Sequence, residues 1–148
     1  MTRALQSELI AKAIRVAYED AIEDSNEQTL WIRQEYLHRV CTLLKESADL
    51  NMQMLISLTA VDYVGYFELV YHLVSMERNH SAVLKCRLYG RDAPVAESVT
   101  DIWRGADLQE REVWDLMGVS FTGHPNLKRV LTWEGFPGHP LQKTHLGG

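Results

Sequence analysis

The last third of the chain limits the possible folds most, because glycine and proline occur there too often for a regular helix or strand. The sequence Gly123-His124-Pro125 returns as Gly138-His139-Pro140. Proline fixes its own φ angle and pushes the preceding histidine to extended conformations, while glycine reaches backbone angles that other residues avoid. We therefore expect an ordered arm without a core of its own, which needs another surface to lie on.

Length and composition indicate one compact domain with an appendage. A chain of 148 residues, 46% of them hydrophobic, can bury one sizeable core but is short for two. The net charge of -5 argues against a nucleic-acid partner, and no run of lysine or arginine suggests a lipid-facing surface. We therefore expect any partner to be a protein.

The cysteines and the apolar runs give expectations about cofactors and location. Cys41 and Cys86 are the only cysteines, which is typical of a reducing cytoplasm, and an ordinary iron-sulfur cluster needs about four thiolates. The longest apolar run, from Met54 to Val61, is interrupted by Ser57 and Thr59, and the N-terminus soon turns polar. We expect neither a membrane span nor an export signal.

Two amphipathic helices are expected in the first half of the chain. Apolar residues recur at helical spacing over residues 5–22, beginning with Leu9, and charged residues lie between them. A second apolar stripe, which includes Val40 and Leu44, predicts a helix over roughly 34–48. Each helix has one apolar face that needs a sheet to pack against.

Strand-like segments accompany the helices, at residues 29–32, 54–62, 67–76 and 82–88. In the second of them, alternation places Met54, Ile56, Leu58 and Ala60 on one face. The breaks between the last three segments are short, which favours antiparallel hairpins. The order helix, strand, helix, strand, strand, strand predicts an α+β fold, a two-layer sandwich of two helices on a mainly antiparallel sheet.

The pattern changes after the third long strand. A short helix is predicted from about 107 to 117, with Gly118 as a left-handed cap at its end. From Val119 onward the chain is the extended C-terminal arm. We therefore divide it into a compact α+β domain, residues 1–92, and a partner-binding segment, residues 93–148, which contains this helix and the arm.

The predicted short helix is strongly charged. Asp107 stands three residues before Glu110, which is the spacing of an N-cap with its capping box. Asp107, Arg111 and Asp115 follow at intervals of four and form one stripe, which we expect to be solvated. Glu110 and Glu112 point to different sides of a helix, which excludes the paired carboxylates of a glycosidase.

Glu110 shares its side of the helix with apolar residues, among them Val113 and Met117. A carboxylate in an apolar stripe caps backbone amides, pairs with a cation or takes a raised pKa. The sequence leaves open whether Glu110 is paired within the chain, pairs with a residue of a partner subunit, or acts as a catalytic acid or base.

The arm histidines allow two interpretations. His124 and His139 stand in matching Gly-His-Pro frames, with His145 beyond them, so a metal site of loop histidines is conceivable. Such a site needs a rigid platform and supporting hydrogen bonds, which the arm lacks in sequence. We expect instead that each imidazole hydrogen-bonds a carbonyl or a carboxylate and fixes a turn.

The sequence contains no nucleophile motif. A Gly-x-Ser-x-Gly elbow and a glycine-rich phosphate loop before a helix are both absent from it. Lys128, Arg129 and Lys143 are interleaved with apolar residues such as Leu131 and Trp133, a composition found on base-stacking surfaces and in protein interfaces. Because the chain is acidic, we favour the protein interface.

The charged helix and the arm together resemble the signature of a known family. The matching segments are Ser98 to Trp103, Gly105-Ala106, Glu110 to Val119, Phe121, Gly123 to Leu127, Arg129-Val130-Leu131 and Gly138 to Leu141, with looser matches at Ser57 to Tyr63 and Phe67 to Val74. In order and spacing they resemble the C-type subunit of NADH-quinone oxidoreductase, which is the 30-kDa subunit of respiratory complex I. One departure lies near the tip, where Gln142-Lys143-Thr144 stands in place of the family's Arg-Lys-Asp.

The resemblance implies a non-catalytic peripheral-arm subunit of a membrane complex that transfers electrons from NADH to quinone and translocates ions. It implies no catalytic residue, cofactor or metal in this chain, since NAD, FMN, iron-sulfur clusters and quinone belong to the parent complex. The implied partners are the 49-kDa-type subunit, also called the D-type subunit, and neighbouring peripheral-arm subunits. The implied place is the cytoplasmic face of the inner (plasma) membrane, reached only through the complex.

The residues expected to bind the partner lie in the charged helix and the arm. They are Glu110, Arg111, Glu112, Asp115, Gly118, Phe121, Gly123, His124, Pro125, Arg129, Gly138, His139, Pro140 and Lys143. Two alternatives stay open. One is the equivalent subunit of a membrane-bound nickel-iron hydrogenase, and the other, from a different class, is a free-standing metal-binding module.

Overall fold

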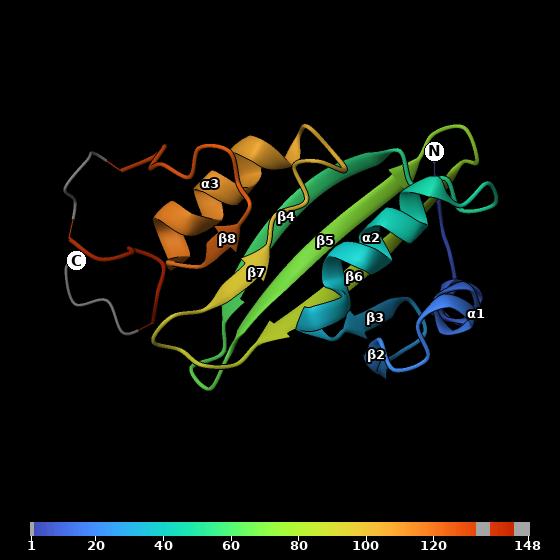
Figure 1. Cartoon of the computed structure of the whole chain (residues 1–148), viewed down its shortest axis with the longest axis horizontal. Helices are drawn as coiled ribbons and strands as arrows, with labels where there is room; N and C mark the ends of the chain where they lie inside the picture. Colours follow the sequence, from blue (N-terminus) through green and yellow to red (C-terminus); the bar gives the residue numbers. More distant parts are fainter. Residues whose placement is uncertain (1, 133–136, 144–148) are drawn as a thin grey trace.

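The computed structural model of the chain, drawn in Figure 1, describes residues 2–132 and 137–143. Its strands are β1 (Arg3–Ala4), β2 (Ile22–Ser25), β3 (Thr29–Ile32), β4 (Met54–Asp62), β5 (Phe67–Ser75), β6 (His80–Leu88), β7 (Val95–Glu97) and β8 (Ser120–Thr122). Its helices are α1 (Ser7–Ala17), α2 (Leu37–Glu46) and α3 (Ala106–Met117), and a 3-10 turn at Gln34–Tyr36 leads into α2.

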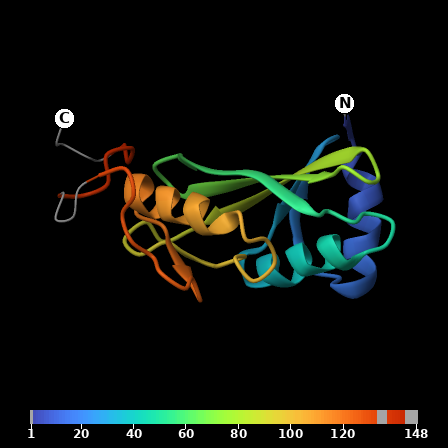
Figure 2. The same ribbon diagram turned by 90° about the horizontal axis from the view of Figure 1, so that it is seen from above.

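Strands β1 to β6 form one sheet, in the order β2-β3-β6-β5-β4 with β1 beside the start of β6. The β4-β5 and β5-β6 pairs are antiparallel, while β3 runs parallel to β6. Helices α1 and α2 lie on one side of this sheet, and the described residues place no helix on the other (Figure 2). The predicted α+β class and the mainly antiparallel sheet are therefore confirmed.

The core lies between the sheet and the helices. Every second side chain of β5, from Phe67 to Leu73, is fully buried, as strand alternation predicts. Ile14 of α1 and Leu44 of α2 are fully buried as well. Burying one such side chain stabilises a fold by about 1.5–3 kcal/mol. This row of side chains is therefore a main source of stability.

The prediction for β4 is wrong in the first half of the strand. Met54 and Ile56 are predicted to share one face with Leu58, but they are 47% and 51% exposed, whereas Leu55 is buried. A register shift between Leu55 and Ser57 inserts an extra residue opposite β5, which reverses the alternation at that point. Beyond this bulge the predicted set is correct, and Leu58 is buried.

Both N-terminal helices are shorter than predicted. Helix α1 ends at Ala17, because Tyr18 has extended backbone angles of φ −141° and ψ 91°. The residues that follow lead into β2, where Ile22 pairs with Ile32 of β3. The charged residues of β2 hide this strand from a search for apolar alternation. Helix α2 begins only after the 3-10 turn and ends at Glu46.

Helix α3 lies beside β4 at one end of the molecule (Figure 1). Gly105 occupies its N-cap position and no side chain caps the helix, so the prediction of Asp107 as the N-cap is wrong. Gly118 has a φ of 78° and ends α3 in the left-handed region, which confirms the predicted cap. Val99 and Val113 belong to the same core as the sheet. The division into two domains stays a prediction.

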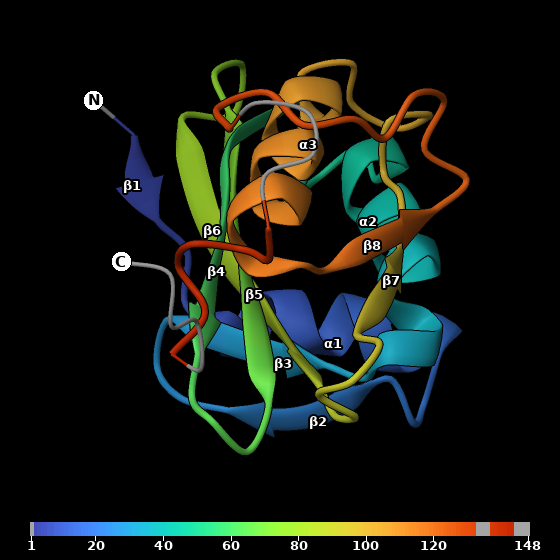
Figure 3. The ribbon, with the colours of Figure 1, turned by 90° about the vertical axis from the view of Figure 1, so that its left-hand side faces the viewer.

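The pair β7-β8 runs parallel and closes the molecule on the other side of α3 (Figure 3). Ala96 and Phe121 at the centre of this pair are buried. After β8 the arm passes around α3 (Figure 3). Across residues 2–132 and 137–143, no helix has the length and apolar character needed to cross a membrane.

Candidate functional site

Glu110 is fully buried in the middle of α3 and binds the segment that precedes the helix. Its carboxylate accepts hydrogen bonds from the hydroxyl of Ser98 at 2.6 Å and from the backbone amide of Val99 at 2.8 Å. Burial raises the pKa of Glu110, and these two hydrogen bonds oppose the rise. Of the roles that the sequence leaves open, pairing within the chain is the one that the geometry confirms.

Asp115 is fully buried as well, and its carboxylate binds the arm. It accepts hydrogen bonds from the backbone amides of Val130, Leu131 and Thr132 at 3.0, 2.7 and 2.8 Å. The hydroxyl of Thr132 and the guanidinium of Arg129 bind the same carboxylate. Burial alone raises the pKa of a carboxyl, but the hydrogen bonds outweigh it and lower the pKa of Asp115 to about 2. The prediction of a solvated stripe is therefore wrong for Asp115.

Arg111 and Asp107, on the same stripe, also contact the arm. The guanidinium Nε of Arg111 donates to the carbonyl oxygen of Lys128 at 3.3 Å. Nδ1 of His124 accepts the amide of Asn126 at 2.9 Å, so the neutral ring carries its proton on Nε2 and donates it to the carbonyl oxygen of Asp107 at 3.1 Å. The expected role of His124 in fixing a turn is confirmed.

His139 fixes the second turn of the arm. Its Nδ1 lies 2.9 Å from the carbonyl oxygen of Asp115, and the centroid of its ring lies 4.9 Å from that of Trp114. Gly118 is required beside it, because a β-carbon at residue 118 would lie 2.8 Å from Cδ2 of His139. The expected role of His139 is thus confirmed, whereas His145 lies outside the described residues.

The end of the described arm returns to the body of the chain. The amide of Leu141 donates to the carbonyl oxygen of Leu116 at 2.8 Å, and the side-chain amide of Gln142 donates to that of Met117 at 2.7 Å. The surface that the arm needs is therefore in part this chain's own α3.

Asp62, at the end of β4, is a site residue that the sequence reasoning missed. Both of its carboxylate oxygens lie 2.5 Å from guanidinium nitrogens of Arg91, and one also accepts the backbone amide of Lys143 at 2.8 Å. Its side chain is buried, and the bond to Arg91 holds its pKa well below the usual range. Because these contacts cross 29 and 81 residues, no local pattern could have indicated them.

The residues predicted for partner contact differ in their exposure. Buried are Glu110, Asp115 and Phe121; half-buried are Arg111, Glu112, Gly118, His124, Arg129, His139 and Pro140; exposed are Gly123, Pro125, Gly138 and Lys143. The structure brings most of these residues together around α3, and the buried side chains among them help to fix the path of the arm.

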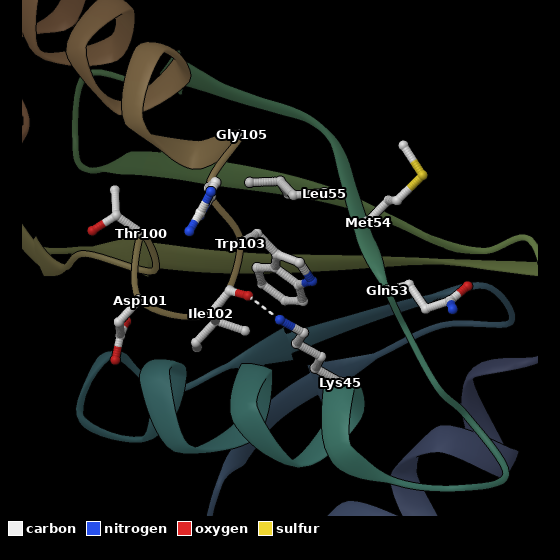
Figure 4. A pocket seen from close by; sticks show the side chains of 10 residues that line it. Lys45, Gln53, Met54, Leu55, Thr100, Asp101, Ile102, Trp103 and Gly105 are labelled. Carbon is white, nitrogen blue, oxygen red and sulfur yellow. Dashed lines mark hydrogen bonds between the residues drawn. The ribbon is translucent and has the colours of Figure 1, made fainter.

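A hollow of about 550 Å³ lies between the end of α2, the start of β4 and the turn before α3. Figure 4 shows the side chains that line it. The ammonium of Lys45 donates to the carbonyl oxygen of Ile102 across it. The indole nitrogen of Trp103 donates to the carbonyl oxygen of Met52 at 3.0 Å. The side chains of Lys45 and Trp103 therefore hold the backbone around the hollow in place. We interpret the hollow as a feature of packing and not as a binding site.

The described residues offer no ready metal centre. They contain no group of three or more His, Cys, Asp or Glu side chains placed to hold an ion. Cys41 and Cys86 are free thiols in the core, and burial raises the pKa of both, that of Cys86 to about 12. These thiols therefore stay protonated near neutral pH.

Residues 30–147 match the family described as respiratory-chain NADH dehydrogenase, 30 Kd subunit. The chain belongs to this family. The segments matched by the family include the charged helix and the arm, so the resemblance seen in the sequence is confirmed.

Curated relatives are named as parts of the same enzyme. The C-type subunit of NADH-quinone oxidoreductase from Roseiflexus castenholzii is 37% identical over 95% of this chain and 84% of its own length. The C-type subunit from Acidothermus cellulolyticus is 41% identical over 94% of this chain and 78% of its own length. A protein of Acidiphilium cryptum that is named C/D is 41% identical over 80% of this chain, but the match spans only 22% of that longer protein.

Solved structures share the fold. A chain of the membrane-bound sulfane sulfur reductase, an archaeal respiratory membrane complex, is 30% identical with a TM-score of 0.65, over 86% of this chain and 75% of that one. The trypsin-resistant fragment 1-134 of Nqo5 is 27% identical with a TM-score of 0.55, over 82% of this chain and 98% of that one.

Proposed function

We propose that this 30-kDa-type subunit serves in a complex I-like NADH:quinone oxidoreductase, where it holds a D-type 49-kDa subunit and its peripheral neighbours in position. The support is the internal use of the signature residues. Glu110 and Asp115 both bind backbone amides of their own chain and so fix the shape of the arm. Signature residues that fix the shape of the arm fit an assembly role better than a catalytic one.

The proposed contribution to electron transfer from NADH to quinone is indirect. Misplacing reacting groups by about 1 Å can cost about 100-fold in rate, so a subunit that only positions its neighbours still affects turnover. In this proposal NAD, FMN, the iron-sulfur clusters and quinone are bound by other subunits. The chain lies at the cytoplasmic face of the membrane and reaches it through the complex alone.

Relatives that are named C/D support the choice of partner. In Acidiphilium cryptum and Nitrosospira multiformis, one protein carries both letters, and this chain matches 22% and 21% of its length. A C-type part and a D-type part on one polypeptide always stay close together. We therefore choose a D-type subunit as the direct partner of this separate chain.

The test is capture of the tagged chain from native membranes, followed by identification of the chains that elute with it and an assay of NADH oxidation with quinone. We expect a D-type subunit in equal amount and NADH:quinone activity in the eluate. The lone purified chain should show no turnover and no stoichiometric metal. Turnover or a tightly held ion in the lone chain contradicts the proposal and favours a free-standing metal-binding module.

A second candidate keeps the assembly role and changes the chemistry of the complex. It is favoured by the likeness to a chain of the sulfane sulfur reductase, at 30% identity and a TM-score of 0.65. Captured complexes that reduce sulfane sulfur, or that evolve hydrogen as a nickel-iron hydrogenase does, without oxidising NADH would support this candidate.

A further inference from the structure

The arm differs in charge from the rest of the chain. Residues 119–148 hold three of the 15 basic side chains and one of the 20 acidic ones, so they carry a net charge of +2. Residues 1–118 hold the other 12 basic and 19 acidic side chains and carry a net charge of −7. A basic segment is attracted to acidic surfaces. The charges therefore indicate an acidic partner for the arm.

Two of the basic side chains of the arm have no partner among residues 2–132 and 137–143. Lys128 and Lys143 are exposed, and no hydrogen bond or ion pair in that part of the chain involves the ammonium of either one. Arg129 differs from them, because its guanidinium donates to the buried carboxylate of Asp115. The ammonium groups of Lys128 and Lys143 can therefore pair with carboxylates of another molecule.

Two large apolar side chains of the arm are exposed close to these lysines in the sequence. Leu131 is 61% exposed and follows Lys128 by three residues, and Leu141 is 59% exposed and precedes Lys143 by two. Apolar side chains at the centre and charged side chains at the rim are typical of a protein interface. The exposed side chains of the arm thus have the composition of a surface that binds a protein.

The backbone of these four residues is fixed by the body of the chain. The guanidinium of Arg111 donates to the carbonyl oxygen of Lys128, and the amides of Leu131, Leu141 and Lys143 donate to Asp115, Leu116 and Asp62. Each exposed side chain is therefore attached to an ordered backbone. Binding then costs less conformational entropy, which is how a preorganised surface gains affinity.

The outer parts of the arm lie at one end of the molecule. Residues 128–132 and 137–143 are found beyond α3 in two perpendicular views (Figures 1 and 2). Helix α1 lies at the opposite end in the same views. One partner surface can therefore contact both parts of the arm at the same time.

We propose that the D-type subunit binds an arm surface made by four exposed side chains, those of Lys128, Leu131, Leu141 and Lys143. The facing surface of the partner takes the two leucines in apolar pockets and pairs the two ammonium groups with Asp or Glu side chains. The buried signature residues give this surface its shape, and the exposed side chains make the contact. This inference rests on the proposed function, because it names where and how the D-type partner binds.

A protein surface explains this composition better than an anionic lipid surface does. Segments that bind anionic lipids usually carry about 4–8 Lys or Arg side chains. The arm carries three, and Asp115 already binds one of them, Arg129. Two lysines at the rim of two exposed leucines instead match the size of a contact between two proteins.

Charge reversal tests the two lysines. The tagged full-length chain is captured from native membranes, and the D-type subunit retained per chain is measured after a wash at about 0.15 M salt. Lys128→Glu combined with Lys143→Glu should lower the retained amount at least about tenfold. Arg3→Glu combined with Lys12→Glu is the matched control. It reverses two exposed cations of β1 and α1 and should retain as much as the original chain does.

The salt dependence separates an ionic contact from a general loss of structure. Raising the salt from about 0.15 M to about 1 M shortens the range of charge interactions from about 8 to about 3 Å. The original chain and the control should therefore retain less of the D-type subunit at high salt, whereas the low retention by the arm variant should hardly change. Full retention by the arm variant, or the same salt dependence as the control, overturns the inference.

Leu131→Ala and Leu141→Ala test the apolar contacts. Each should lower retention at least about fivefold, because a leucine in an interface pocket contributes through its burial. Leu9→Ala is the matched control, since Leu9 of α1 is 57% exposed, and it should leave retention unchanged. All three variants should unfold in urea at nearly the same concentration, as surface substitutions do. Retention that is unchanged in both arm variants contradicts the proposed contacts.

The lone purified chain tests two other occupants of the arm surface. We expect it to stay monomeric in size-exclusion chromatography and not to sediment with vesicles that contain phosphatidylserine. Self-association or vesicle binding that Lys128→Glu with Lys143→Glu abolishes would show that the arm surface serves a second copy or a membrane. Either result would overturn the inference.

The outcomes separate this inference from the proposed function. If the original chain retains the D-type subunit and the arm variants retain as much as their controls, the arm surface is not the binding site although the partnership stands. If the original chain retains no D-type subunit at all, the proposed function fails together with this inference.

Discussion

The backbone amide of Thr132 donates a 2.8 Å hydrogen bond to the carboxylate of Asp115, which lies 17 residues earlier in α3. The amides of Val130 and Leu131 donate to the same oxygen. The buried carboxylate of Asp115 thus accepts hydrogen bonds from successive backbone amides of the arm, which would otherwise need water as their acceptor. The path of the arm depends on the charge of this one side chain.

Asp115→Asn should lower the free energy of unfolding by about 2 kcal/mol, because a neutral amide accepts more weakly and turns a donor toward other donors. Urea unfolding at neutral pH measures the loss. Glu112→Gln, at a half-buried carboxylate on the same helix, should change stability by less than about 0.5 kcal/mol. Equal losses in the two variants would show that the hydrogen bonds to Asp115 do not matter.

Protonation of the Asp115 carboxylate should lower the free energy of unfolding at acidic pH. Its pKa of about 2 in the folded chain lies below the value of about 3.9 in an unfolded chain. Its stabilising effect is therefore fully present above about pH 4 and is lost as the pH falls through about 2. The difference between the original chain and Asp115→Asn should shrink over this window. A difference that is constant from pH 6 to pH 2 would contradict the lowered pKa.

The sequence predicted the sheet well where a strand alternates without interruption, as β5 does. It failed where structure depends on residues outside the local window. The bulge at Ile56 reverses an alternation that looks regular in the sequence. Strand β2 has only one apolar residue, so alternation could not indicate it. Local spacing cannot show an inserted residue, since the insertion is defined by the neighbouring strand.

The candidate site shows the same limit. The spacing of Gly-His-Pro turns predicted that His124 and His139 fix the arm, because their neighbours dictate that geometry. The burial of Asp115 could not be predicted, since the chain that covers it comes 14 to 17 residues later. Asp62 depends on Arg91 and Lys143, which are even more distant. From sequence alone a charged residue is predicted to be solvated, because the distant residues that cover it are not known.

Glu110→Gln should have a pH-dependent effect. Burial raises the pKa of Glu110 in the folded chain, so the folded state holds this proton more tightly than the unfolded state. The contribution of Glu110 to stability is therefore greatest at low pH, where this group is protonated in both states, and falls as the pH rises through the carboxyl range. Glutamine does not titrate and lacks this decline.

At pH 4 the protonated Glu110, like glutamine, offers one carbonyl oxygen to the two donors from Ser98 and Val99, so the variant and the original chain should differ in stability there by less than about 1 kcal/mol. Toward pH 7 the original chain should lose stability relative to the variant in urea unfolding, so the gap between them should change with pH. A gap that stays constant with pH would show that the pKa of Glu110 is not raised.

Gly118→Ala should displace the second turn of the arm. The φ of 78° at Gly118 costs another residue about 1–2 kcal/mol, and the added β-carbon meets the ring of His139. Gly90→Ala is the matched control, because its φ is 89° but no atom lies within 4 Å of the new β-carbon. The variant at 118 should lose more stability than the control and also shift the NMR signals of His139 and Gln142. Equal effects would mean that only backbone strain matters.

Asp62→Asn should release the end of the arm without unfolding the chain. The carboxylate holds the amide of Lys143 and is itself held by Arg91, and hydrogen bonds to a charged group contribute about 1.5–3 kcal/mol. Trypsin cleavage after Lys143 should therefore speed up at least about tenfold. Cleavage after Arg129, which Asp115 holds, should keep its rate, and Asp115→Asn should produce the reverse pattern. Equal acceleration at both bonds would indicate that either change loosens the whole arm, so that the two carboxylates do not act as separate anchors.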